Sequence, residues 1–217
     1  MTISELPLQL PLLNVYGAVV FSDTQLPLPM TEEQYEKILL LSEKTNFIIG
    51  IVQPKNPENL PVKGNLPIFH SGTAVQLNGA SEYDETHVIV QVKGLCRFII
   101  KDEFMVDDKF RFAKVSYNKY IYADSIPSKL EDFDRSTFTA LMKSFMHQRG
   151  VKPNWRELEA VSPRELINFV TMVGPLEASE KQAILEQTNP NDQKHLLEKI
   201  MTMSLTDTPS TLSTLRH

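Results

Sequence analysis

The sequence lacks the cysteines of a disulfide-rich protein and the long apolar run of a membrane-spanning helix. Its single cysteine, Cys96, excludes an internal disulfide framework and favours a reducing compartment. No run approaches the roughly 18 apolar residues that a membrane-spanning helix needs. The N-terminal Met-Thr-Ile-Ser-Glu has neither a basic region nor a continuous apolar stretch. We therefore expect no signal peptide and a cytoplasmic location.

Motifs for phosphate binding and hydrolysis are also missing. No glycine is followed by lysine, which excludes the usual phosphate-binding loop. There is no Gly-x-Ser-x-Gly turn of a serine hydrolase and no His-Glu-x-x-His helix of a zinc peptidase. The five histidines lack metal-ligand spacing to one another or to Cys96. We expect a non-enzymatic protein with no catalytic residues, no metal and no cofactor.

The remaining composition is that of an ordinary globular protein. A chain of 217 residues, 41% hydrophobic and 23% charged, can form one large domain or two small ones. The net charge of −5 argues weakly against a nucleic-acid or anionic-membrane partner.

The first half of the chain is predicted to be rich in β-strands. Short apolar segments predict strands at residues 15–21, 47–52, 68–77, 87–92, 95–100 and 110–115. We expect turns at Asn78–Asp84 and at Lys93-Gly94. Four prolines between Gln53 and Pro67 predict a long, mobile surface loop. Strands spaced by roughly 8–12 residues favour a small barrel or sandwich.

Helical periodicity begins after Pro127. Four apolar residues predict one helix that ends at Gly150: Phe138, Leu141, Met142 and Phe145. Ser162-Pro163-Arg-Glu165 has the pattern of a capping box, and Asn154-Trp-Arg-Glu157 and Ser179-Glu-Lys-Gln182 suggest two further helix starts. Asn189-Pro190 opens the last helix, whose apolar face comprises Leu196, Leu197, Ile200 and Met203.

Several short motifs, in order along the chain, resemble the N-terminal substrate-binding domain of Lon proteases. The chain opens with Leu-Pro-Leu segments around a Val-Val-Phe21 stretch, and a helix with Tyr35 follows. The other matching motifs are Gly72-Thr-Ala, Gly94-x-x-Arg97-Phe98, Phe112-Ala-Lys-Val and Glu180-Lys-Gln-Ala-Ile-Leu-Glu186. The resemblance extends from about Leu6 to Met203. It departs from the family where Phe21 is followed by Ser22-Asp23 and where His70-Ser71 precedes Gly72.

The resemblance implies an α+β fold. A β-rich, PUA-like pseudo-barrel would occupy residues 1–124 and a helical bundle residues 125–203, with residues 204–217 as a flexible tail. It also implies non-catalytic binding of unfolded or tagged polypeptide, or of a protein partner, by an adaptor or regulator in protein quality control. An exposed sheet edge or a groove near Ala123–Lys129 would bind the peptide. The alternatives are an RNA-binding module and, last, a small-molecule hydrolase. The sequence identifies neither the binding residues nor the oligomeric state.

Polar residues that could form a site have simpler explanations. His87 with Asp84 and Glu85 is best explained as a solvated turn, and Cys96 as a core residue. The paired carboxylates Asp102-Glu103 and Asp107-Asp108 are best explained as solvated charges near turns.

Aromatic residues offer two candidate surfaces. Tyr117, Tyr120 and Tyr122 could stack nucleobases beside the basic residues Arg97, Lys114 and Lys119, although cross-strand packing is the simpler explanation. Trp155 with Met142, Phe145 and Met146 could form a docking surface, although packing between helices is the simpler explanation.

Overall fold

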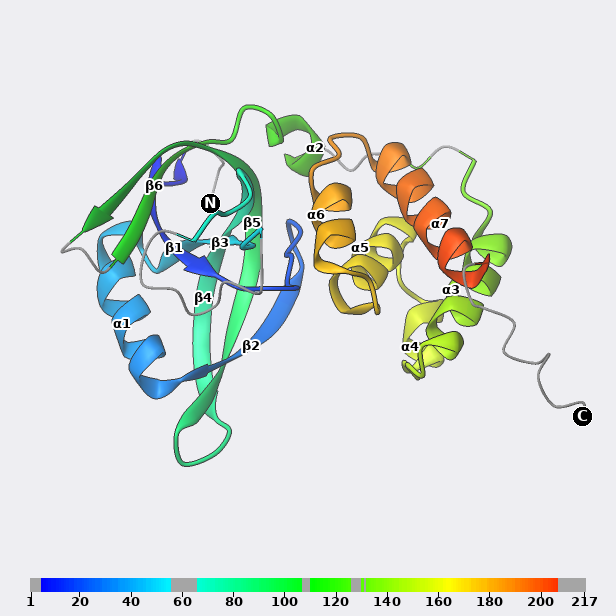
Figure 1. Cartoon of the computed structure of the whole chain (residues 1–217), viewed down its shortest axis with the longest axis horizontal. Coiled ribbons are helices and arrows are strands. Elements are labelled where there is room, and N and C mark those ends of the chain that lie inside the picture. The colour runs from blue at the N-terminus through cyan, green and yellow to red at the C-terminus, as the bar shows by residue number, and fades with distance from the viewer. Residues whose placement is uncertain (1–4, 56–65, 107–109, 126–129, 131, 207–217) are drawn as a thin grey trace, which may run out of the picture. The chain divides into compact units, whose positions relative to one another are not determined.

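The computed structural model describes residues 5–55, 66–106, 110–125, 130 and 132–206. Its contacts divide the chain into two compact units: unit 1 comprises residues 1–128 and 177–188, and unit 2 comprises residues 129–176 and 189–217. Strands come first and helices follow, so the fold is α+β, as predicted (Figure 1). The boundary expected between residues 124 and 125 remains a prediction, because contacts do not show which part folds alone.

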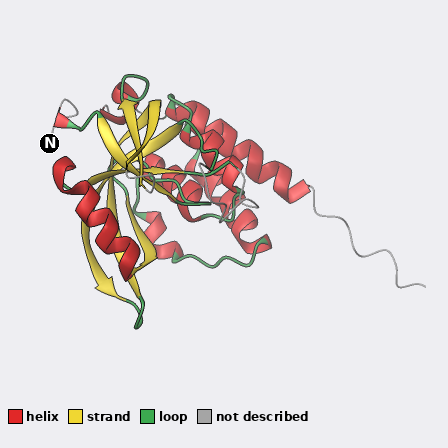
Figure 2. Cartoon of the chain, turned by 60° about the vertical axis from the view of Figure 1, so that its left-hand side comes forward, coloured by secondary structure: helices red, strands yellow, loops and turns green. Residues whose placement is uncertain are grey.

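The sheet of unit 1 closes on itself. Its strands are β1 (Gln9–Asn14), β2 (Gln25–Thr31), β3 (Ile48–Val52), β4 (Ser71–Glu82), β5 (His87–Val106) and β6 (Phe110–Ser116). They lie in the order β2-β5-β4-β3-β1-β6, and β5 also pairs with β6. That extra pairing joins β5, β4, β3, β1 and β6 into a ring, which is the predicted pseudo-barrel (Figures 1 and 2).

Strand β1 changes partner at its proline. Gln9, Leu10 and Pro11 pair antiparallel with β6, and Leu12 to Asn14 pair parallel with β3. Proline has no N–H to donate, so it suits the point at which one ladder ends and the other begins.

The strand predicted at residues 15–21 is wrong. This segment turns at Gly17, whose φ is 72°, and then runs without a regular ladder, although Val20 and Phe21 are buried. Its polar backbone groups bind side chains instead: Gly17 N donates to Gln53 Oε1, and Thr73 Oγ1 donates to the Val20 carbonyl. Apolar side chains predicted burial correctly, but burial does not require a strand.

The turns predicted around Asn78–Asp84 and at Lys93-Gly94 are also corrected. Strand β4 continues to Glu82, and β5 passes through Gly94 without interruption. A Cβ on Gly94 would lie 2.0 Å from the Phe21 carbonyl oxygen. Gly94 also exchanges backbone hydrogen bonds with Asp23 and Thr24. This glycine therefore permits a close approach of two chain segments, rather than a turn.

Helix α1 (Glu32–Ser42) covers one part of the sheet, and the one-turn helix η2 (Glu43–Thr45) follows it. Thr31 and Gln34 form a capping box at the start of α1. Ile38, together with Tyr35 and Leu39, packs against buried side chains of β2 to β5. Figures 1 and 2 show α1 lying along the sheet.

Unit 1 also contains the short helices α2 (Ile121–Ser125) and α6 (Ala178–Leu185). The expected cap at Ser179 is wrong, because α6 begins two residues earlier, after Glu177, whose N–H donates to Glu180. Buried Gln53 donates to Ala178 O and to Gln182 Oε1, and Gln182 donates to Ser71 O, each at 3.1 Å. This polar network fastens α6 to the sheet.

The loop expected at Gln53–Pro67 lies mostly outside the described residues, since these omit 56–65. Its two ends are joined. Lys55 N donates to Pro67 O at 2.8 Å, and Phe69 N donates to Gln53 O at 2.9 Å.

Unit 2 is helical, as predicted. It contains α3 (Arg135–Gln148), α4 (Trp155–Glu159), α5 (Pro163–Val173) and α7 (Pro190–Thr206). The capping box at Ser162 and Glu165 is confirmed, but Asn154 makes no side-chain cap and donates to Glu157 instead. On α7, Leu197 and Met201 are buried, whereas Met203 of the predicted apolar face is exposed.

Candidate functional site

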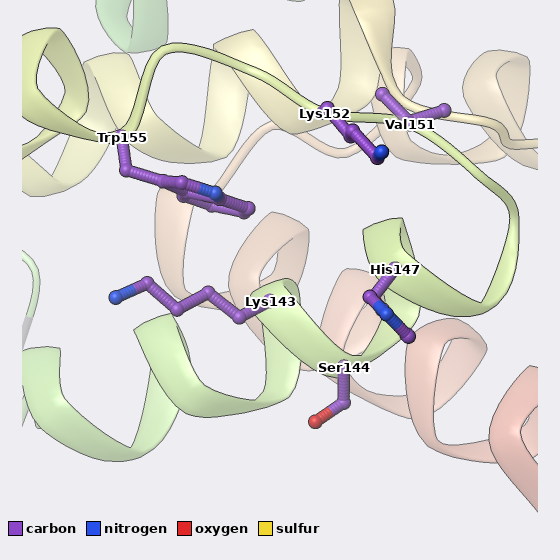
Figure 3. Close-up of a pocket in the computed structure, with 6 residues that line it drawn as sticks. All are labelled: Lys143, Ser144, His147, Val151, Lys152 and Trp155. Atoms are coloured by element: carbon purple, nitrogen blue, oxygen red, sulfur yellow. The ribbon is translucent and has the colours of Figure 1, made fainter.

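A hollow of about 480 Å³ opens on unit 2 between α3 and the segment that follows it (Figure 3). We name it the Trp155 groove. Six residues line it: Lys143, Ser144, His147, Val151, Lys152 and Trp155. Figure 3 shows Lys143, Ser144 and His147 on the helix, and Trp155 and Lys152 reaching toward them from the facing segment. The volume is in the range of small-molecule and side-chain pockets, roughly 300–1,000 Å³.

Helix α3 supplies one wall because its two faces differ. Phe138, Met142 and Phe145 are buried in the core of unit 2. Lys143 and His147 are four residues apart and so lie on one exposed stripe of the same helix.

The chain reverses sharply after α3 and forms the second wall. Gly150 has a φ of 73°, its N–H donates to His147 O, and Val151 N donates to Met146 O. This pair of hydrogen bonds is the Schellman motif, which requires a left-handed residue that glycine adopts without strain. Pro153 holds Lys152 in an extended conformation, so the returning segment runs past α3 as far as Trp155.

The far end of the segment is fastened to the start of α3. Arg135 donates to the carbonyl oxygens of Leu158 and Glu159 at 2.9 and 3.0 Å. A second hollow of about 60 Å³ lies beside this contact and shares Lys143 and Trp155 with the first. With both ends of the segment attached to α3, the groove is preformed.

The groove combines an apolar face with positive charge. The Lys143 ammonium lies 5.4 Å from the centre of the Trp155 ring, within the range of a cation–π contact. Lys143, Lys152 and His147 are exposed, and Trp155 is half-buried. No acidic residue is among the six that line the larger hollow, and Glu159 borders only the smaller one.

Packing between helices, the simpler explanation for Trp155 with Met142, Phe145 and Met146, holds for three of these four residues. Trp155 does line a groove, but Met142, Phe145 and Met146 are core residues with at most 1% exposure. Sequence reasoning missed Lys143, His147 and Lys152. The signals available were the four-residue spacing of Lys143 and His147 and the glycine at position 150, which reverses the chain.

The tyrosines do not form a base-stacking platform. Tyr120 is fully buried, its hydroxyl is 3.0 Å from Ser71 Oγ, and Tyr117 is 5% exposed. Burial raises the pKa of the Tyr117 hydroxyl, which donates to Pro7 O. Only Tyr122 is exposed. Tyr117 and Tyr120 therefore pack inside unit 1, but not as the cross-strand pairs expected, because β6 ends at Ser116 and Tyr122 lies in α2.

The basic residues beside them do not form a patch either. Arg97 is 1% exposed, so it presents no charge to solvent. Lys114 is paired with Asp102 at 3.2 Å, and Lys119 lies over the Tyr120 ring.

Asp84 and Cys96 have the simple roles expected. Asp84 lies in an exposed turn, where hydrogen bonds from the Thr86 backbone and the His87 side chain lower its pKa to about 2. Cys96 is fully buried. Asp102 and Glu103 were expected as solvated charges near a turn, but they lie inside β5, and Glu103 forms a largely buried ion pair with Arg111 at 2.7 Å. Asp107-Asp108 lie outside the described residues.

The described residues contain no group of three or more His, Cys, Asp or Glu that could hold a metal ion. None of the helices built from them is long and apolar enough to cross a membrane.

Unit 1 is a closed barrel with an attached helix, and unit 2 is helical and carries an open groove. Comparison with known proteins assigns this combination to a family. The family model of the substrate-binding domain of the ATP-dependent protease La (LON) matches residues 9–203. The chain therefore belongs to the Lon substrate-binding domain family, as its motifs predicted.

Two solved structures share the fold. The Lon N-terminal domain protein from Xanthomonas campestris is 15% identical with a TM-score of 0.56, over 87% of this chain and 96% of that one. The N-terminal domain of the Mycobacterium avium complex Lon protease is 12% identical with a TM-score of 0.59, over 92% and 98% of the two chains. No curated protein matches the sequence.

Proposed function

We propose that this chain is a non-catalytic module that binds unfolded or tagged polypeptide and acts as an adaptor or regulator in protein quality control. The observation that carries the proposal is the match of a substrate-binding domain model to residues 9–203. The motifs absent from the sequence support it, since the chain has neither a phosphate-binding loop nor a hydrolase turn. A cytoplasmic location, where unfolded substrates of this kind occur, is part of the same proposal.

The Trp155 groove is the binding surface that this proposal favours. Its tryptophan, valine and lysine side chains suit a peptide side chain packed on an aromatic face with its polar end toward solvent. The free edge of the sheet is less suitable. Strand β2 ends the strand order and has Pro27 and Pro29 at alternate positions, so it lacks two outward N–H donors with which a peptide strand could pair.

The test is binding of a reduced, denatured model protein to the full chain. We expect saturable binding by fluorescence anisotropy of the labelled model protein, and no binding of the same protein in its native form. Casein incubated with the pure chain should remain intact, with or without ATP. Failure to bind the denatured protein would remove the proposed function, and degradation of casein that one point mutation abolishes would show an enzyme instead.

A further inference from the structure

We infer that the Trp155 groove selects acidic segments of polypeptide, in which Asp or Glu flanks an apolar side chain. The inference rests on the proposed polypeptide-binding function and narrows its substrate class. It assigns the apolar side chain to the face of Trp155 and Val151, and the carboxylates to Lys143 and Lys152.

Charge is the first argument. The chain carries a net charge of −5, yet the six residues that line the groove include two lysines and no carboxylate. Within the part of the chain that the structure describes, neither Lys143 nor Lys152 forms an ion pair. The nearby Glu157 accepts a hydrogen bond from Asn154. A local positive site on an acidic protein attracts an anionic partner and repels a cationic one.

The placement of the lysines is the second argument. Lys143 projects from α3 and Lys152 from the facing segment, so the two ammonium groups belong to opposite walls (Figure 3). An extended peptide lying between the walls would place a carboxylate near each. Side chains alternate in direction along an extended strand, so carboxylates on either side of an apolar pair point to opposite walls, and one apolar side chain of the pair faces the Trp155 ring.

The rigidity of the walls is the third argument. The Gly150 reversal and the Arg135 hydrogen bonds hold the segment at both ends. A groove that exists before binding loses little conformational entropy when a peptide enters.

A nucleic acid fits the groove less well than a peptide. Trp155 is the only tryptophan of the chain, and no Phe or Tyr is among the six lining residues, whereas binding of single strands relies on a series of stacking rings along a basic channel. The chain as a whole is acidic, which opposes a polyanion.

The single tryptophan makes the test specific to the site, because all tryptophan fluorescence of the full chain comes from the groove. The probes are three capped peptides of equal length. The acidic peptide has Asp and Glu on either side of a Leu-Phe pair. The neutral peptide has Asn and Gln at the same positions, and the basic peptide has Lys at both. We expect the acidic peptide to shift the Trp155 emission to shorter wavelength and to bind roughly three- to tenfold more tightly than the neutral one. The Lys peptide should bind weakest, and added salt should reduce the preference.

A charge-matched pair of variants completes the test. The double variant Lys143→Gln and Lys152→Gln should bind the acidic and neutral peptides equally. The control double variant, Lys44→Gln and Lys101→Gln, changes two exposed lysines of unit 1 and should keep the preference for the acidic peptide.

Equal affinity of the unmodified chain for the acidic and neutral peptides would overturn the inference. So would a single-stranded RNA that shifts Trp155 emission at lower concentration than the acidic peptide. If the denatured protein binds but no peptide changes the emission, the proposed function stands and this site is wrong. If the denatured protein does not bind, the function itself fails.

Discussion

Arg97 shows how one buried charge can be accommodated. Its guanidinium group donates to the carbonyl oxygens of Leu185 and Gln187, both at 2.6 Å, at the end of α6. The group lies 4.5 Å from the centre of the Tyr120 ring and 5.9 Å from that of Phe21. One guanidinium nitrogen, Nη1, donates to both carbonyl groups, and a positive charge at a helix C-terminus is favourable.

Replacing Arg97 tests this role. Arg97→Lys keeps the charge, but the shorter side chain lacks the planar group that lies over the Tyr120 ring and reaches the end of α6, so we expect a loss of about 2–4 kcal/mol in the free energy of unfolding. Urea denaturation followed by circular dichroism measures the loss. Lys101→Gln, at an exposed position of the same strand, should change the stability by less than about 0.5 kcal/mol. An unchanged midpoint for Arg97→Lys would show that the guanidinium group contributes nothing beyond its charge.

Two glycines of unit 1 should respond differently to the same substitution. A Cβ at Gly94 would meet Phe21 O at 2.0 Å, whereas one at Gly17 has no atom within 4 Å but a φ of 72°. We expect Gly94→Ala to destabilise by about 3 kcal/mol or more, because backbone must move, and Gly17→Ala by about 1–2 kcal/mol. The ratio of the two losses in thermal unfolding is the measurement. Similar losses would contradict the close-approach role of Gly94.

At the scale of elements, the start of α5 links stability to pH. Glu165 accepts the Ser162 N–H at 2.6 Å, and the hydrogen bonds with Ser162 lower the Glu165 pKa below its ordinary value of 4.5. The unfolded chain then binds the proton more readily than the folded one. The ionised Glu165 carboxylate therefore stabilises the folded chain above pH 4.5, and this stabilisation is lost as the pH falls through the lowered pKa of the folded state.

Glu165→Gln should therefore flatten the acid side of the stability curve. The amide can still accept the Ser162 N–H but does not titrate, so the difference in melting temperature between neutral and acidic buffer should shrink. Glu159→Gln, an exposed carboxylate of the same unit, provides the matched control. An identical acid response in Glu165→Gln and the unmodified chain would contradict the linkage.

The prolines of β2 are expected to prevent edge pairing. Pro27 lies opposite Gln91 and Pro29 opposite Ile89, and neither can donate a hydrogen bond from the outer edge. The double change of Pro27→Val and Pro29→Thr restores both donors, so the chain should associate at high concentration, as measured by light scattering. Gln91→Val adds a similar apolar side chain to the adjacent strand without a new edge donor and should remain unassociated. Equal association of both variants would implicate hydrophobicity alone.

The sequence predicted these elements unevenly, for physical reasons. Ser162 and Glu165 signalled a helix start correctly because a capping box involves only neighbouring residues. Gly94 and residues 15–21 were misassigned because their conformations depend on residues far away in the sequence. Gly94 lies against the segment Phe21 to Thr24, and Gly17 is held in position by a hydrogen bond to Gln53. For the same reason the sequence indicated Trp155 but not the lysines of the Trp155 groove. Trp155 attracted attention as a residue type, whereas the lysines face it only after Gly150 reverses the chain.

At the scale of the whole molecule, chain order and structural unit differ. Helix α6 follows α5 in sequence, yet its contacts group it with the sheet. Two buried side chains of the barrel depend on it, since Gln53 and Arg97 donate to its carbonyl groups, and its own Gln182 donates to Ser71 O. A fragment of residues 1–124 has the complete barrel but leaves Gln53 and Arg97 without these partners. Each buried polar group left unpaired costs about 1–3 kcal/mol, and more when charged.

We therefore expect residues 1–124 alone to be unstable or aggregated. The same residues joined by a flexible linker to residues 176–188 should fold with cooperative thermal unfolding. The linked fragment with Gln182→Ala is the control, because it retains the helix but loses the hydrogen bonds of Gln182 with Gln53 and Ser71. Its melting temperature should fall between that of residues 1–124 alone and that of the unmodified linked fragment. Circular dichroism and size-exclusion chromatography measure both properties. If residues 1–124 unfold cooperatively at the temperature of the linked fragment, the boundary predicted from the sequence is a true domain boundary, and α6 is an accessory to the barrel rather than part of its core.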